Sequence, residues 1–294
     1  MDITIPPQNF DEASYLAAHP DVADAVRKGQ IASGWAHALR FGYREGRSAI
    51  PTDVAAQIEA FWRDVASGKV ERVPPEALRV RVHGGADLAS FYLTGATIEG
   101  DIERTLAQMS IAVGEHAKVL DFGCGCGRVL RHVAGKHPGW ALFGSDIDGE
   151  TIGWCRDHIA QTAEFSQNPE WPPSAYPDDF FDLVYSISVF THLPEDMQAA
   201  WLEELKRITK PSGILLLSIH NINLAPEGLR ENEDFLYCGG GPTDGLPEFY
   251  QTTFHPHSYV RKFWNRYLQI ESILERQING HQDLVVCVKR SGGA

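Results

Sequence analysis

The stretch LDFGCGCGR, residues 120–128, places three alternating glycines and two cysteines directly behind an apolar strand pattern. Its GxGxG spacing differs from the GxGxxG loop of dinucleotide-binding folds, because Arg128 stands where that loop has its third glycine. A glycine-rich turn after a strand can hold a phosphate, a metal ion or another ligand. The turn alone therefore does not identify its ligand.

Length and charge narrow the class of protein. The chain has 294 residues, enough for one α/β domain of ordinary size and a small additional module. Its formal net charge of −13 argues against nucleic acid as the main partner, because a phosphate backbone requires a dense basic face. No apolar run approaches the ~20 residues of a membrane span, and the N-terminal residues lack a signal-peptide pattern. We expect a cytoplasmic protein without a membrane span.

The five cysteines are odd in number, and four of them lie in strand or helix patterns, which favours reduced thiols over a disulfide framework. Cys124 and Cys126 form a CxC pair, but no second pair or histidine cluster stands nearby at ligand spacing. Small residues packing under a tight turn explain the pair better than a zinc site does. No metal ion is predicted.

The chain is predicted to divide into a helical module (residues 1–50), a helical linker (51–89) and a main domain (90–294). Pro and Gly signals break residues 10–47 into short helices, and this stretch resembles a small helical repeat of bacterial surface-associated and glycan-related proteins. Such a unit serves as a cap or linker, or as a surface for protein contact or oligomerisation. Further helices are expected over 52–69 and 98–112, with a Pro- and Gly-marked connection between them.

From residue 118 onward, strand and helix patterns alternate. Helices are expected from Arg128, from Glu150, and over 195–210 and 256–267. Single helices between most strands indicate βαβ units, hence a parallel, doubly wound sheet with its ligand site at the carboxyl ends of the strands. The final two strands are joined by a short loop through Gly280, so the last strand is antiparallel. The seven strands are predicted at 118–122, 140–146, 164–167, 182–189, 213–220, 268–275 and 282–290.

Four segments together resemble a class I S-adenosylmethionine-dependent methyltransferase: VLDFGCGCGR, GSDID, FDLVYSISVFTHL and ELKRITKPSGILLLSIH. The resemblance covers residues from about 90 to about 290 and implies S-adenosylmethionine as cofactor. Within this family the sequence is most similar to bacterial enzymes linked to sugar or glycan biosynthesis. A small-molecule or glycan-related acceptor is therefore expected, with O-methylation favoured.

The expected cofactor residues lie at the strand ends. The three glycines let backbone approach the ligand, Asp121 can attract its ammonium, and Asp146 can accept hydrogen bonds from the ribose hydroxyls. Asp148 is the second choice for the ribose, although helix capping suits it better. Phe165 and Asn168 are adenine-side candidates, with packing and turn roles as alternatives. The predicted set is Asp121, Gly123, Gly125, Gly127, Asp146, Ile147, Ser186 and Ile187.

A hydroxyl acceptor needs a base, and histidine is the side chain best suited to this at neutral pH. Of the twelve histidines, three fall at or near the carboxyl edge of the predicted sheet, namely His192, His220 and His255, with His192 preferred. In the family, a histidine at the place of His192 often lies beside the transferred methyl, or it is structural. The helical segment around Tyr92 is expected to close over the cofactor.

The segment 221–254 is too long for a simple connection, which predicts a binding loop or lid whose glycines 239–241 permit motion. Two other functions stay open. One is an NAD(P)-dependent oxidoreductase, which shares the sheet but should carry GxGxxG. The other is a non-catalytic S-adenosylmethionine-binding protein with an assembly or regulatory role, whose N-terminal helices form the contact surface.

Overall fold

The computed structural model describes residues 11–28, 30–31, 33–38, 72–229, 234–241 and 245–289, with the single residues 45, 47, 60, 63, 67 and 243. The helix expected over 52–69 lies almost entirely outside the described residues. Contacts divide the chain into two compact units, Met1–Thr97 and Ile98–Ala294. None of the described helices is both long and apolar enough to span a membrane.

The first unit begins with short helices, as predicted: α1 (Glu12–Ala18), α2 (Pro20–Arg27) and α3 (Gly34–His37). Polar contacts join the first of these helices to the third. The Glu12 carboxylate accepts hydrogen bonds from the backbone N–H groups of Gly34 (2.5 Å) and Trp35 (2.9 Å). The Tyr15 hydroxyl lies 3.0 Å from His37 Nδ1.

The connection expected between the two predicted helices is instead largely helical. It contains α5 (Glu76–His83), and α6 runs over Leu88–Gln108, so the prediction of a helix starting near residue 98 was wrong. Pro75 caps the start of α5, and Gly84 ends it in a left-handed conformation (φ 73°). These Pro and Gly residues mark the two ends of a short helix. In the sequence, the same residues read as a loop signal.

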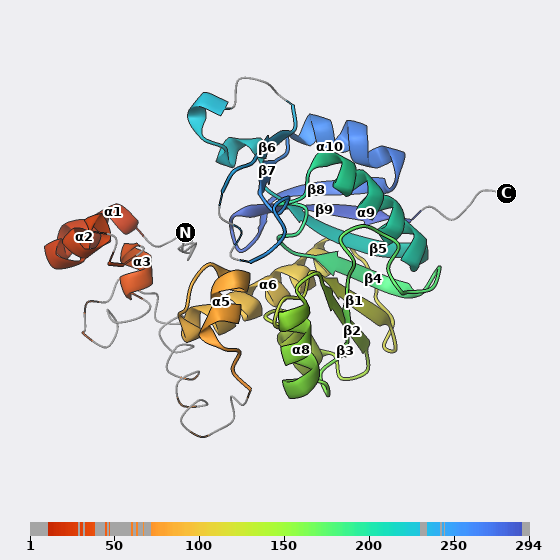
Figure 1. The fold of residues 1–294 in the computed structure, drawn as a ribbon, viewed down its shortest axis with the longest axis horizontal. Coiled ribbons are helices and arrows are strands. Elements are labelled where there is room, and N and C mark those ends of the chain that lie inside the picture. The colour runs from red at the N-terminus through yellow and green to blue at the C-terminus, as the bar shows by residue number, and fades with distance from the viewer. Residues whose placement is uncertain are drawn as a thin grey trace. The chain divides into compact units, whose positions relative to one another are not determined.

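The second unit contains the predicted seven-stranded sheet, in the order β3-β2-β1-β4-β5-β9-β8 (Figure 1). The first five strands are parallel, and β9 runs antiparallel to both of its neighbours, which confirms the doubly wound sheet with an antiparallel last strand. The strands are β1 (Lys118–Phe122), β2 (Ala141–Asp146), β3 (Glu164–Gln167), β4 (Phe181–Ser186), β5 (Thr209–Ile219), β8 (Gln269–Ile278) and β9 (Gln282–Val288).

Strand β4 ends three residues earlier than the apolar pattern predicts, because Ser188 takes a left-handed conformation (φ 63°) and turns the chain. The segment 221–254 is also more regular than expected. It contains the 3₁₀ turns Ile222–Leu224 and Glu227–Leu229 and a separate antiparallel pair, β6 (Leu236–Cys238) and β7 (Thr252–Phe254).

The helices of the second unit start within two residues of the predicted positions: α7 (Leu130–Lys136), α8 (Gly149–His158), α9 (Glu195–Ile208) and α10 (His257–Phe263), which a 3₁₀ turn (Trp264–Arg266) extends. Figure 1 shows α8 near the β3 end of the sheet, α9 near β5, and α10 near β8 and β9 at the other end.

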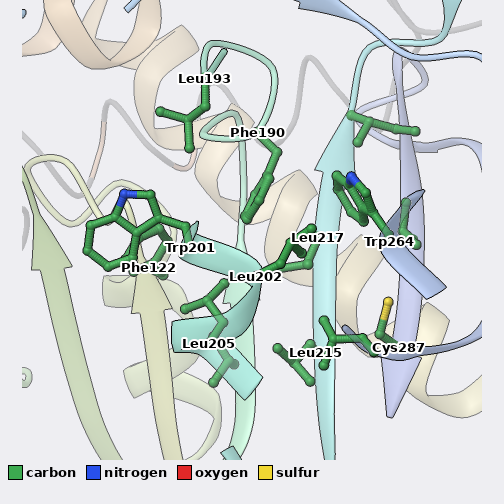
Figure 2. Close-up of a cluster of buried hydrophobic side chains, with 14 of the residues drawn as sticks. Phe122, Phe190, Leu193, Trp201, Leu202, Leu205, Leu215, Leu217, Trp264 and Cys287 are labelled. Carbon is green, nitrogen blue, oxygen red and sulfur yellow. The ribbon is translucent and has the colours of Figure 1, made fainter. Parts of the chain in front are cut away.

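Helix α9 shows why these elements pack. Its apolar residues recur at helical spacing, so Trp201, Leu202 and Leu205 all lie in one buried cluster with strand residues such as Phe122 and Leu215 (Figure 2). This cluster fixes the helix against the sheet. It leaves the strand ends free to carry polar groups.

Strands β1, β2, β4 and β5 are parallel, so their last residues meet at one edge of the sheet, here called the carboxyl edge. Strand β9 runs the other way and therefore starts at this edge, where Asp283 pairs with Ile219. The turns after β1, β2, β4 and β5 consequently lie together.

Candidate functional site

The turn after β1 requires its glycines. Gly123, Gly125 and Gly127 have φ values of 85°, 51° and 73°, a conformation that side chains disfavour. A Cβ on Gly123 would lie 2.1 Å from Val189 Cγ2, and one on Gly127 would lie 2.7 Å from Ile159 Cδ1. The glycine turn is thus packed against the turn that follows β4, and Val189 and Ile159 occupy the space that side chains at Gly123 and Gly127 would need.

Asp146, at the end of β2, holds the glycine turn in place. Its Oδ2 accepts a hydrogen bond from the Gly125 N–H (2.8 Å), and its Oδ1 accepts one from the Asp148 N–H (2.9 Å). A carboxylate has about four acceptor sites, so each oxygen can accept a further hydrogen bond, for instance from a hydroxyl. Burial raises the pKa of Asp146.

Several residues in and after β2 and β3 make hydrogen bonds or packing contacts within the protein. Asp148 caps α8, accepting from the backbone N–H groups of Glu150 and Thr151 (3.0 and 3.3 Å), as the capping alternative predicts. The Asn168 amide donates to Ser145 Oγ (3.2 Å). Phe165 is buried against β2, and the carbonyl of Ile147 accepts from the Gln167 amide (3.0 Å).

Asp121 is a buried carboxyl near the end of β1, with 2% of its surface exposed. Burial raises the pKa of Asp121 to about 8; the Tyr185 hydroxyl opposes this rise, the Asp146 carboxylate adds to it and the Arg128 guanidinium reduces it. A raised carboxyl pKa means that the charged form lacks compensation, and a bound cation would supply it.

Ser186 and Ile187 lie at the carboxyl end of β4, and both are buried. The Ser186 hydroxyl has no hydrogen-bond partner within the part of the chain that the structure describes. A buried hydroxyl of this kind is costly unless another group binds it. The hydroxyl at the end of β4 is therefore available to form a hydrogen bond that none of the described residues provides.

His192 lies in the turn after β4, where its N–H donates to the carbonyl of Val189 (2.9 Å). Its ring nitrogen Nδ1 lies 2.8 Å from the carbonyl oxygen of Gln251, which can only accept. Nδ1 therefore carries the hydrogen, and Nε2 keeps a free lone pair. Burial lowers the pKa of His192 to about 4, so the imidazole is neutral at neutral pH. Its ring stacks on that of Tyr250, with centroids 4.2 Å apart.

The structure brings two of the three predicted histidines together. The rings of His192 and His220 lie 6.3 Å apart at the carboxyl edge, and burial lowers the pKa of His220 to about 3. His255 is fully buried, and its Nε2 contacts the Gln198 amide at 3.0 Å in the interior of the unit. Because its Nε2 is already engaged with Gln198, His255 is a weaker candidate for the base than His192.

Tyr250 and Gln251 are site residues that the sequence analysis missed. Both residues belong to the segment 221–254, and no local sequence motif marks them. Gln251 is 59 positions from His192 in the sequence. Tyr92 lies on α6 in the first unit and is 9% exposed.

Cys124 and Cys126 of the glycine turn, and Cys155 on α8, are buried thiols that form no disulfide, and burial raises the pKa of all three. Among the residues that the structure describes, one group of metal-ligating side chains stands out: Glu99, Glu103 and His137, whose ligand atoms lie within 4.8 Å of one another. Both glutamates already have partners there, since Lys136 lies 2.5 Å from Glu99 and His137 lies 2.9 Å from Glu103.

Comparison with known proteins agrees with this geometry. The profile of a family described as "Methyltransferase domain" matches residues 96–269, more than half of the chain. A 2-methyl-6-phytyl-1,4-hydroquinone methyltransferase from Synechocystis sp. is 33% identical over 105 residues, which are 35% of this chain and 32% of that protein. A tRNA (carboxymethyluridine(34)-5-O)-methyltransferase from Arabidopsis thaliana is 33% identical over 102 residues, 34% of this chain and 23% of that protein. The match thus spans about a third or less of these relatives.

Solved structures show the same fold at low sequence identity. One chain of the complex between the Haloferax volcanii Trm112 methyltransferase activator and a methyltransferase has a TM-score of 0.52 and 18% identity, covering 74% of this chain and 100% of that one. An S-adenosylmethionine-dependent methyltransferase from Clostridium acetobutylicum has a TM-score of 0.51 and 11% identity, covering 68% and 92%. Fold, glycine turn and family match together assign this chain to the class I S-adenosylmethionine-dependent methyltransferases, a family and fold that imply S-adenosylmethionine as the cofactor.

Proposed function

We propose that this protein transfers the methyl group of S-adenosylmethionine to an oxygen atom of a small-molecule or glycan-related acceptor. The observation that carries the proposal is the placement of a neutral, oriented imidazole beside the glycine turn. Val189 packs against Gly123, and three residues later His192 keeps the lone pair of Nε2 free.

The residues of the carboxyl edge fit the cofactor. Its ammonium would restore the charge of Asp121, and its ribose hydroxyls would find the remaining acceptor sites of Asp146. The glycine turn allows a close approach to backbone, and the Ser186 hydroxyl can bind a further polar group. Each of these features is costly for the protein alone and becomes favourable with such a ligand.

Bound S-adenosylmethionine supplies an electrophilic methyl group on a positively charged sulfur. His192 Nε2 would accept the proton of the acceptor hydroxyl as its oxygen takes the methyl group, while the methyl–sulfur bond breaks and S-adenosylhomocysteine leaves with that electron pair. A pKa of about 4 makes His192 a weak base. A weak base is sufficient here, because an oxygen that is gaining a methyl group becomes positive and its proton strongly acidic. Burial of the site also keeps water from the methyl group.

We infer the acceptor class from the net charge of the chain, set beside the acceptors of two relatives. By their names, the two relatives described above act on a hydroquinone and on tRNA. For this chain a net charge of −13 disfavours a polyanionic acceptor and favours a small neutral or sugar-like one. The proposal includes a cytoplasmic location and residues 90–294 as the methyltransferase domain. It gives the helical module 1–50, with its linker 51–89, a capping or protein-contact role.

The test is to incubate the protein with deuterated-methyl S-adenosylmethionine and a bacterial lysate, then identify labelled products by mass spectrometry. The expected product carries the label on oxygen, together with equimolar S-adenosylhomocysteine. Cofactor binding without any S-adenosylhomocysteine would instead favour the non-catalytic alternative. A label on nitrogen or sulfur would keep the enzyme and overturn O-methylation.

A further inference from the structure

We propose that Tyr250 is a positioning residue, which together with the adjoining segment Gln251–Thr253 holds His192 in its reactive tautomer and orientation. This inference rests on the proposed function, because it gives His192 the role of base. It extends that function by making the base depend on the segment 221–254, here called the lid, and on how that segment is docked.

The lid and the turn after β4 are joined by reciprocal hydrogen bonds. His192 donates from Nδ1 to the Gln251 carbonyl (2.8 Å), and the Gln251 N–H donates back to the His192 carbonyl (3.2 Å). Two residues further along, the Thr253 N–H donates to the Thr191 carbonyl (2.8 Å). The tautomer of His192 is thus set by a carbonyl that belongs to the lid, so an undocked lid would leave Nδ1 without this acceptor.

Tyr250 adds a second constraint, on the orientation of the ring. The Tyr250 and His192 rings are nearly parallel, with an interplanar angle of 19°. The Tyr250 hydroxyl donates to the Ser188 carbonyl (3.3 Å) at the start of the same turn. Tyr250 therefore touches the turn at Ser188 and at His192, which fixes the imidazole plane relative to the end of β4.

Charged residues of the expected cofactor site also affect the ionisation of this tyrosine. Burial raises the pKa of Tyr250, the nearby Asp146 carboxylate raises it further, and the Arg128 guanidinium lowers it. Its hydroxyl therefore lies within the electrostatic field of both the glycine turn and the end of β2.

The Gln251 side chain extends this connection into the body of the lid. Its Oε1 accepts from the Gly241 N–H (2.9 Å), and its Nε2 donates to the carbonyls of Gly241 (3.2 Å) and Glu248 (2.9 Å). These bonds hold Gly241 and Glu248 against the residue whose carbonyl binds His192.

The titratable groups around His192 come from three elements. His220 follows β5, and its ring lies 5.6 Å from that of His281, which precedes β9. On the lid side stands Tyr250, with Asp146 and Arg128 within electrostatic reach of its hydroxyl. The pKa values of His220 and His281 are both lowered by burial, and burial is also the main cause of the lowered pKa of His192.

The experiment compares Tyr250→Ala and Tyr250→Phe with wild type in two ways: steady-state kinetics over pH, and NMR titration of His192. For Tyr250→Ala we expect kcat to fall about tenfold or more, with cofactor affinity changed less than about threefold. The pKa of His192 should rise toward about 6.5 as the ring becomes exposed, which shifts the acidic limb of the pH–rate profile upward. Tyr250→Phe keeps the stack and should restore most of kcat and of the lowered pKa.

Trp140→Leu is the matched control, because it removes an aromatic ring stacked on another histidine, His137, at 3.7 Å. It should change neither kcat nor the His192 titration. The proposal is overturned if Tyr250→Ala keeps the wild-type pH–rate profile and His192 titration. It is also overturned if that variant only tightens cofactor binding, which would make Tyr250 a cover. If wild type transfers no methyl group, the proposed function fails, while the NMR arm still reports on positioning. Should Tyr250→Ala not fold, Tyr250→Leu gives the same readouts.

Discussion

The backbone N–H of Gly125 donates a 2.8 Å hydrogen bond to the carboxylate of Asp146, which joins the turn after β1 to the end of β2. Asp146 therefore shapes the glycine turn and at the same time offers lone pairs to a ligand. The two roles are coupled, because a side chain with fewer acceptor sites than a carboxylate could not bind both the turn and a ligand fully.

Asp146→Asn is therefore expected to weaken cofactor binding by about 1–3 kcal/mol, since an amide offers one acceptor oxygen where the carboxylate offers two. Isothermal titration calorimetry with S-adenosylhomocysteine measures this change. Asp182→Asn is the matched control, because the Asp182 carboxylate binds the backbone of Lys118 at the opposite edge of the sheet. Equal affinities of both variants would move the ribose contact elsewhere.

Gly123→Ala should damage the site more than a helical glycine replacement damages the fold. The new Cβ would lie 2.1 Å from Val189 Cγ2 on a left-handed backbone, so we expect a loss of roughly 1–3 kcal/mol in stability and a marked loss of cofactor affinity. Gly100→Ala, where a Cβ meets nothing within 4 Å, should be stabilising by about 0.5–1 kcal/mol. Urea unfolding and calorimetry on both variants would show whether this order is reversed.

His192→Ala should lower kcat by about 10²-fold or more while leaving cofactor affinity nearly intact, because the lost group acts on the transition state. His220→Ala serves as the comparison, since its ring lies beside that of His192. A larger loss in His220→Ala would reassign the base to the end of β5. Full activity of both variants would mean that positioning of the acceptor carries the reaction.

Cofactor binding should strengthen with pH through Asp121. Its folded-state pKa of about 8 means that the ligand-free carboxyl is largely protonated at neutral pH, whereas a bound ammonium favours the charged form. Binding then releases a proton, so affinity should rise from about pH 6 to about pH 8. Calorimetry in buffers of different ionisation enthalpy detects that proton, and Asp121→Asn should lose both effects. Proton release that persists in the variant would place the titrating group elsewhere.

The folded state should lose stability on acidification because of His220 and His255, each buried with a pKa lowered to about 3. Between about pH 6.5 and that value the unfolded chain binds protons that the folded chain excludes, so stability falls as pH falls. The slope is about 1.4 kcal/mol per pH unit for each histidine. Urea unfolding of wild type and His220→Asn over this range should differ by one such slope, and parallel curves would contradict the assignment.

The positions of the sheet strands and of most helices were predictable because their signals are local. Apolar runs bounded by Gly and Pro mark β1 and β2, and apolar spacing marks α9. The start of α6 was not predictable in this way, since glycines at positions 95 and 100 weaken its helical pattern. Tertiary packing decides such a segment, and a single sequence does not display it.

The candidate site likewise contains residues that local signals predict and residues that only tertiary packing brings together. Asp121, Asp146 and the three glycines stand at strand ends, so their neighbourhood follows from parallel topology alone. The contact of His192 with Gln251 spans 59 positions and depends on how an irregular segment folds back. The contact of His255 with Gln198 spans 57 positions and was equally invisible in the local sequence.

Strand β9 lies between β5 and β8, although it follows both in the chain. During synthesis these two strands therefore emerge with open edges, which stay unpaired until residues 282–288 leave the ribosome. The nascent chain thus passes through an interval in which two apolar strand edges are available to neighbouring molecules. A frameshift or nonsense mutation just before Gln282 should therefore yield aggregated protein and no folded, shortened methyltransferase.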